Sequence, residues 1–231
     1  MGKINTNSNV YTIVYATVLV IIVAFLLALA NSALKPRQDA NVALSQKKQI
    51  LASINERNLG DKQSEETYNA LISDAQVGDL TFYIAKKDGK ELYILPVRGA
   101  GLWGAIWGYV ALNDDRNTIF GTYFDHESET PGLGGEIKTE KFQNQFIGKH
   151  ILDANGQFVG IGIMKAGQTA DGMEQVDAIS GATITSKGVE TMIQTSVQQF
   201  AEAGFFETST SETSTTSETS EDIVEPTNEE E

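Results

Sequence analysis

The run from Asp177 to Ser186, DAISGATITS, holds the residue types best suited to chemistry in this sequence. Small residues at Ser180, Gly181 and Ala182 let a bulky group approach the backbone closely. Hydroxyl residues of the kind that cap helices follow where a helix is expected to begin: Thr183, Thr185 and Ser186. A phosphate held here would meet amide donors and the positive end of the helix. The run therefore indicates either a phosphate-bearing ligand or a plain helix cap without a ligand.

A second run, from Asp125 to Gly134 (DHESETPGLG), ends a predicted strand in a Pro-Gly turn. Functional loops have this form, and so do ordinary solvated turns. Glu127 and Glu129 lie two residues apart, so on a strand they share a face without forming a catalytic pair. A single histidine such as His126 is more often structural or exposed than a ligand. The sequence predicts no catalytic residue and no metal site.

A third run, from Arg98 to Val110 (RGAGLWGAIWGYV), contains four glycines and two tryptophans. The glycines allow close backbone approach, and Trp103 and Trp107 are suited either to packing on a flat ring or to the core beside a glycine turn. The glycine spacing follows no predicted strand and lacks a Lys-Ser or Lys-Thr ending. It therefore supports neither a dinucleotide-binding fingerprint nor a P-loop.

The elements that must position these runs are predicted to form an α+β domain, an antiparallel sheet with packing helices. Apolar, strand-like segments lie at 80–85, 92–97, 106–112, 118–124 and 158–165. Lys87-Asp88-Gly89-Lys90 joins the first pair as a hairpin, because Asp-Gly tolerates positive φ angles. Helices are expected from Pro36 to about Arg57, over 64–75 with Tyr68, Leu71 and Ile72 facing inward, and over 185–203. The last helix places five apolar side chains on one face: Val189, Met192, Ile193, Val197 and Phe200.

An uncharged apolar stretch from Val10 to Leu34 is long enough to cross a hydrocarbon layer about 30 Å thick as one helix. The alternative is a cleaved signal peptide, since Ala28-Leu29-Ala30 offers small residues for cleavage. The stretch is longer than the apolar region of a signal, and only Lys3 precedes it, which favours a retained anchor. Four cations after the stretch favour a cytoplasmic domain, although that rule weakens when a long domain follows: Lys35, Arg37, Lys47 and Lys48.

Composition excludes several classes of function. The 231 residues carry a formal net charge of −14, which argues against a nucleic-acid partner because phosphate binding needs excess Lys and Arg. The chain has no cysteine, which excludes disulfides, iron–sulfur clusters and zinc-thiolate sites, so redox chemistry would need an organic cofactor. Nine acidic and no basic residues lie in 207–231, and this Ser/Thr/Glu-rich segment has too few apolar residues to fold.

In order along the chain, the apolar stretch, RGAGLWGAIWGYVAL, DHESETPGLG and DAISGATITS resemble the C-type subunit of the sodium-translocating NADH:quinone oxidoreductase. The resemblance covers 5–203 and leaves out the acidic tail. ETPGLG and DAISGATITS also mark the wider FMN-binding domain family, including the homologous G-type subunit of a ferredoxin-linked electron-transport complex. The GLWG…GYVAL segment favours the sodium pump. A membrane-anchored binding or scaffold domain without a cofactor is the alternative from another class.

The resemblance implies FMN joined through its phosphate to Thr183 by a separate flavin transferase that uses FAD, with Thr185 as the nearby competitor. It implies further cofactor contacts at Ser180, Gly181, Ala182, Ile184, Thr185, Glu129, Thr130, Leu133, Gly134 and Lys165. The flavin is then expected to relay electrons in a six-subunit translocase that oxidises NADH, reduces ubiquinone and exports sodium.

The same resemblance implies a single-pass protein of the cell inner membrane with its soluble domain in the periplasm, against the charge count. The predicted organisation is a short N-terminal segment (1–9), a transmembrane helix (10–34), a soluble FMN-binding domain (35–206) and a disordered acidic tail (207–231).

Overall fold

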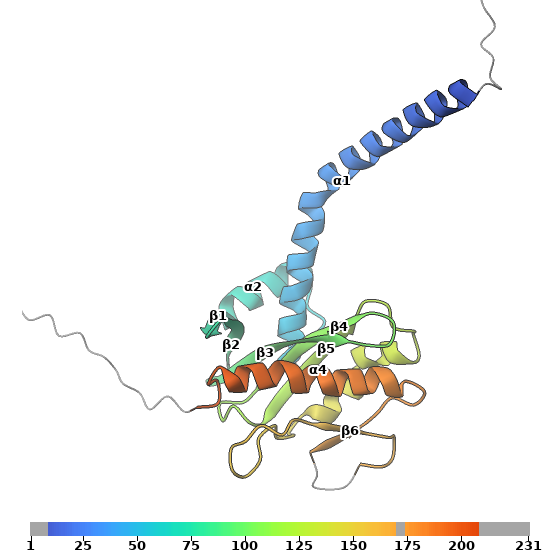
Figure 1. The fold of residues 1–231 in the computed structure, drawn as a ribbon. Helices are drawn as coiled ribbons and strands as arrows, with labels where there is room; N and C mark the ends of the chain where they lie inside the picture. Colours follow the sequence, from blue (N-terminus) through green and yellow to red (C-terminus); the bar gives the residue numbers. More distant parts are fainter. Residues whose placement is uncertain (1–8, 170–173, 208–231) are drawn as a thin grey trace, which may run out of the picture.

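The computed structural model describes residues 9–169 and 174–207, so most of the predicted acidic tail lies outside the described residues. Helix α1 (Asn9–Ser53) runs without interruption for 45 residues. The prediction of a new helix from Pro36 to about Arg57 is wrong, because Pro36 lies inside α1 and the helix ends at Ser53. An interior proline removes one backbone hydrogen bond and bends a helix. Figure 1 shows α1 bent between its darker and paler blue parts.

The first part of α1 is exposed along its apolar length, and the last turn is buried in the domain. Among the described residues, α1 is the helix that is long and apolar enough to cross a membrane, by length and composition alone. A signal sequence near the N-terminus would pass the same test. At the other end Ile50, Leu51, Ala52 and Ser53 are buried. One helix therefore connects the apolar stretch directly to the folded domain.

Five antiparallel strands form the central sheet in the order β1-β2-β3-β4-β5. Their bounds are β1 (Ile72–Val77), β2 (Leu80–Lys87), β3 (Lys90–Ala100), β4 (Ala105–Leu112) and β5 (Ile119–His126). The four predicted strands of this sheet are confirmed. Asp88 at φ 51° and Gly89 at φ 75° turn β2 into β3 as the Asp-Gly signal predicts.

Strand β1 was not predicted. Helix α2 (Asp61–Leu71) ends at Leu71, and the chain then pairs with β2, with Ile72 opposite Ala85. The predicted helix over 64–75 was therefore too long, because pairing along a sheet edge overrides local helical spacing. The inward placement of Tyr68, Leu71 and Ile72 is confirmed, since all three pack against a cluster formed by the end of α1 and the sheet.

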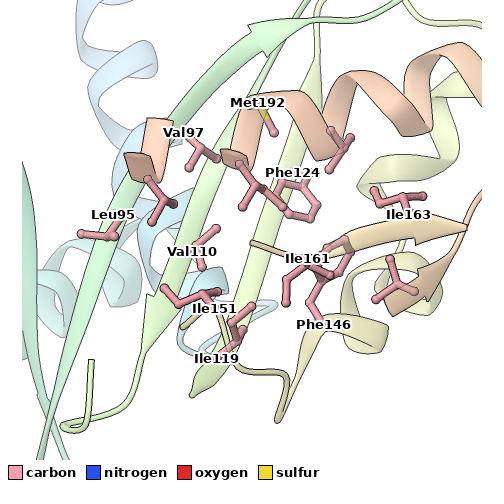
Figure 2. Close-up of a cluster of buried hydrophobic side chains, with 14 of the residues drawn as sticks. Leu95, Val97, Val110, Ile119, Phe124, Phe146, Ile151, Ile161, Ile163 and Met192 are labelled. Carbon is pink, nitrogen blue, oxygen red and sulfur yellow. The ribbon is translucent and has the colours of Figure 1, made fainter. Parts of the chain in front are cut away.

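The main core lies between the sheet and helix α4 (Thr183–Glu202), which begins two residues earlier than predicted. All five apolar residues predicted on its inner face are buried. Figure 2 shows Met192 meeting sheet residues such as Val97, Val110 and Phe124. The segment after β5 adds 3-10 helix η1 (Gly134–Lys138), α3 (Glu140–Gln143) and η2 (Asn144–Phe146). A short parallel pair follows, β6 (Gly162–Met164) and β7 (Gln175–Asp177), so the strand predicted over 158–165 is shorter than expected.

Candidate functional site

The Ser180–Ser186 segment makes the turn that opens α4. Gly181 has a φ of 78°, which an L side chain rarely adopts, and Ala182 is the residue before the first helical turn. No side chain caps this helix, so the prediction of a hydroxyl cap is wrong. The Ser186 hydroxyl instead accepts a hydrogen bond from the Ile179 amide at 3.0 Å. This bond between Ile179 and Ser186 closes the turn, and Thr183 is the first residue of the helix.

The two candidate hydroxyls, on Thr183 and Thr185, lie in very different surroundings. Thr183 is exposed, whereas Thr185 is only 1% exposed. The Thr185 hydroxyl donates a hydrogen bond of 2.6 Å to Oε2 of Glu129. An external enzyme therefore has access to Thr183, while Thr185 is enclosed and bonded within the domain.

Glu129 is the residue that joins three separate segments at this point. Its side chain is 4% exposed, and its Oε1 accepts a hydrogen bond of 2.8 Å from the Trp103 amide. Burial alone would raise the pKa of Glu129, but hydrogen bonds from the Thr185 hydroxyl and three successive amides (Trp103, Leu102 and Gly104) outweigh burial and lower it. The carboxylate is therefore held ionised, and it ties the 101–104 turn and its own loop to α4.

Two glycines make room for this carboxylate. A Cβ added to Gly101 would overlap Oε1 of Glu129, and one added to Gly134 would overlap Oε2. The added Cβ at Gly134 would also lie 2.6 Å from the Thr185 hydroxyl oxygen. Gly134, predicted as a cofactor contact, is buried against these two side chains.

Four exposed apolar side chains, here named the apolar rim, belong to the segments that Glu129 joins. Their exposed fractions are 48% for Leu102, 67% for Trp103, 42% for Leu133 and 61% for Ile184. Leu133 lies against the Gly181 turn, since a Cβ added to Gly181 would be 3.0 Å from Leu133 Cδ2. Trp103 is thus no core residue, and two members of the rim, Ile184 and Leu133, offer apolar surface at the turn that carries Thr183.

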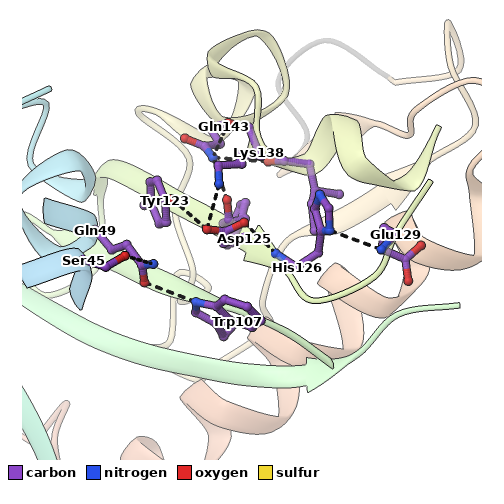
Figure 3. Close-up of polar contacts among 11 residues, drawn as sticks. Ser45, Gln49, Trp107, Tyr123, Asp125, His126, Glu129, Lys138 and Gln143 are labelled. Carbon is purple, nitrogen blue, oxygen red and sulfur yellow. Dashed lines mark hydrogen bonds and ion pairs between the residues drawn. The ribbon is translucent and has the colours of Figure 1, made fainter. Parts of the chain in front are cut away.

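The first half of the DHESETPGLG run forms a structural hydrogen-bond network behind the loop (Figure 3). Asp125 Oδ2 accepts from the Tyr123 hydroxyl and from Lys138 Nζ, both at 3.0 Å. The His126 amide donates to Asp125 Oδ1, and the Glu129 amide donates to His126 Nδ1 at 3.2 Å. Burial, with Asp125 beside it, raises the pKa of Tyr123. His126 therefore takes part in this network through its Nδ1 atom.

The same figure shows how the site is linked to α1. Trp107, on the sheet face that meets α1, donates from Nε1 to Oε1 of Gln49 at 3.2 Å.

Glu127 is exposed and accepts a long hydrogen bond of 3.4 Å from the Ala105 amide. Glu127 and Glu129 thus have separate partners and form no pair.

The remaining predicted contacts lie at the surface around the turn. Thr130 and Ser180 are exposed, and the Thr130 carbonyl accepts from the Leu133 and Gly135 amides. Lys165 is exposed and directly follows β6, where the Met164 carbonyl accepts from the Ala178 amide at 2.7 Å. Ser180 also lines a cavity of about 480 Å³, together with residues that include Glu136 and Lys141. The structure thus brings Glu129, Leu133 and Gly134 against the Gly181–Thr185 turn and leaves Thr130, Ser180 and Lys165 open to solvent.

Comparison with known proteins places this geometry in a family. The family described as FMN-binding domain matches residues 101–198, which include the 101–104 turn, the Glu129 loop and α4. The C-type subunit of the Na(+)-translocating NADH-quinone reductase of Pseudomonas aeruginosa is 31% identical over 240 residues, covering 82% of this chain and 91% of that protein. Its counterpart in Haemophilus ducreyi is 32% identical, covering 82% and 90%. The chain belongs to the family of C-type subunits of Na(+)-translocating NADH-quinone reductases.

A solved member of this family has the same fold. The crystal structure of the C-type subunit from Parabacteroides distasonis superimposes with a TM-score of 0.68 at 36% identity, covering 74% of this chain and 96% of that one. The resemblance inferred from the sequence motifs is therefore confirmed, together with the predicted α+β architecture.

Sequence reasoning missed how Glu129 is bound. The residue was predicted as a cofactor contact, and the structure shows in addition that its two carboxylate oxygens accept hydrogen bonds from the Trp103 amide and the Thr185 hydroxyl. Gly101 and Gly134 were the available signal, because glycine is required where a neighbouring group approaches the backbone. Which group approaches them depends on the pairing of β4 with β5, which spacing alone does not reveal.

Proposed function

We propose that this chain is the electron-relay subunit of a sodium-translocating NADH:ubiquinone reductase and carries FMN on Thr183 through a phosphoester. The observation that carries the choice of residue is the contrast between the two hydroxyls: Thr183 is exposed, and Thr185 is buried and bonded to Glu129. A modifying enzyme must reach the oxygen that it modifies. Family membership and the FMN-binding domain match support the relay role.

The attachment requires one bond to form and one to break. The Thr183 oxygen forms a P–O bond to the FMN phosphorus of FAD, the pyrophosphate bond of FAD breaks, and AMP leaves. The hydroxyl proton passes to a base of the flavin transferase. The Gly181 turn and the small residues Ser180 and Ala182 leave space for the phosphate, which the positive end of α4 favours. When bound, FMN supplies the ability to accept and pass on electrons.

The surroundings of Thr183 suit both ends of this cofactor. The apolar rim, which includes Leu133 and Ile184, offers contacts for a flat aromatic ring. Ser180, Thr130 and Lys165 are exposed polar groups suited to the phosphate and ribityl oxygens. Glu129 and Gly134 are buried and pack against Thr185, so they hold the turn that carries these contacts in place.

The proposed mounting keeps the predicted organisation of the chain. Residues 10–34 remain as a membrane span, 35–206 form the soluble domain, and 1–9 and 207–231 flank them. The exposed apolar length of α1 and its buried last turn support a retained anchor that continues as one helix into the domain. The soluble domain is proposed to face the periplasm, on the side of the flavin transferase, within a six-subunit complex of the cell inner membrane.

Denaturing electrophoresis of the full chain, produced together with the transferase, tests the attachment. The wild type is expected to give a fluorescent flavin band and Thr183→Ala a dark one. Thr191→Ala is the matched control, because Thr191 is another exposed threonine of α4. A fluorescent band from Thr183→Ala would refute the proposed site.

A further inference from the structure

Glu129 differs from Asp125, the other buried carboxylate of this region, because it forms no ion pair with any of the described residues. Asp125 is 8% exposed and forms an ion pair with Lys138 at 3.0 Å. Glu129 is 4% exposed, and none of the ion pairs among the described residues includes it. Within the described part of the chain, the site therefore contains one desolvated negative charge that no ion pair with Lys, Arg or His neutralises.

Neutral donors keep this charge in place. The Trp103 amide donates to one carboxylate oxygen and the Thr185 hydroxyl donates to the other, and the neighbouring amides of Leu102 and Gly104 add to the lowering of the pKa of Glu129. Successive amides of this kind form a concave anion-binding nest. The donors offset the cost of burial but bring no net positive charge, so the local charge remains −1.

The charge lies directly behind the turn that carries the proposed flavin. Thr185, its hydrogen-bond partner, is two residues from Thr183 in α4, a rise of about 3 Å along the helix. Leu133, from the loop that begins at Glu129, lies against Gly181 of the same turn. A charge in a buried position acts through a low effective dielectric and is little screened by salt.

We propose that Glu129 is a positioning residue whose buried negative charge lowers the reduction potential of the FMN held on Thr183. Adding electrons to the cofactor increases its negative charge, which a fixed anion nearby opposes. The bonds of the same carboxylate fix the 101–104 turn against α4, so the charge is held at one place. This inference rests on the proposed attachment of FMN.

The test is the midpoint potential of the FMN-loaded full chain, measured for two matched variants. Glu129→Gln removes the buried charge. The side-chain carbonyl of glutamine can still accept from the Trp103 amide, and its NH2 group can donate to the Thr185 hydroxyl oxygen. Glu127→Gln removes an equal charge two residues away that is exposed to solvent. We expect Glu129→Gln to raise the midpoint potential, and Glu127→Gln to shift it by less than about a third as much, because solvent screens an exposed charge. Equal shifts, or no shift in Glu129→Gln, would overturn the inference.

A second variant decides the matter if Glu129→Gln does not fold. Leu102 is 48% exposed and directly precedes Trp103, whose amide donates to Glu129, so Leu102→Lys adds a cation to the turn that holds the carboxylate. It is expected to raise the midpoint potential, with Val159→Lys as a control at an equally exposed position outside the site. An unchanged potential in Leu102→Lys would then refute the role of the charge.

The two proposals fail in different ways. A wild-type chain without covalent FMN would refute the attachment itself. A fully loaded Glu129→Gln chain with the wild-type potential would refute the role of Glu129 and leave the attachment standing.

Discussion

The hydrogen bond between Thr185 and Glu129 gives the sharpest prediction about stability. Thr185→Val keeps the shape of the side chain and removes the hydroxyl that donates to Oε2 at 2.6 Å. Thr185 is 1% exposed and Glu129 is 4% exposed, so water does not replace the lost donor. A hydrogen bond to a charged group contributes about 1.5–3 kcal/mol. Thr and Val have similar helix propensities, so this bond accounts for most of the change.

The assay is urea unfolding of the full chain in detergent. With a slope of about 1–3 kcal/mol per molar urea, the midpoint of Thr185→Val should fall by about 1 M. The control is Thr191→Val, an exposed position of the same helix, which should change stability by no more than about 0.5 kcal/mol. Thr185→Val should nevertheless keep its fluorescent flavin band. An unchanged midpoint would show that the bond contributes little, and a dark band would place the attachment at Thr185.

Three other features of the structure can be tested in the same way. Gly134→Ala should destabilise the domain by about 1–3 kcal/mol, because the added Cβ would overlap the Glu129 carboxylate. Gly162→Ala is the control, because its added Cβ would lie at an ordinary 3.5 Å from Gln175, and equal urea midpoints of the two variants would contradict the prediction. The lowered pKa of Glu129 stabilises the fold above pH 4.5, and this stabilisation is lost as the pH falls through the pKa of the folded state. In acid unfolding, Glu129→Gln should therefore lose less stability than the wild type as the pH falls, and identical stability profiles in acid would contradict this prediction. Burial raises the pKa of Tyr109 from 10.0 to about 12, so the protonated phenol stabilises the fold below pH 10 and this stabilisation is lost between pH 10 and 12. Tyr109→Phe should therefore lose less stability than the wild type over this range, and an equal dependence of stability on pH would contradict the prediction.

The sequence predicted those parts of the fold that depend on local patterns. Two apolar, strand-like segments and the Asp88-Gly89 turn between them identified the β2–β3 hairpin, and helical spacing identified the buried face of α4. The sequence did not predict β1, because Ile72 continues a helical pattern and becomes a strand only by pairing with Ala85 of β2. It also placed a helix start at Pro36, where the structure continues one helix through the proline.

The candidate site was predicted as three runs but not as an assembly. By residue type alone, Thr183 and Thr185 are equal candidates. The family resemblance favours Thr183, and the structure separates the two by their exposure and by the bond from Thr185 to Glu129. The role of Glu129 depends on the Trp103 amide, 26 residues away in the sequence. Contacts of this kind follow from the register between β4 and β5, where Ile106 lies opposite His126, and spacing along the chain does not determine that register.

Mass spectrometry of the tryptic peptide 166–187 from the wild-type chain tests the central claim most directly. This peptide contains both candidate threonines and ends at Lys187, and fragmentation assigns any modification to one residue. The account predicts a mass increase equal to FMN less one water, located on Thr183. An unmodified peptide from a chain produced with the transferase, or a modification on Thr185, would contradict it.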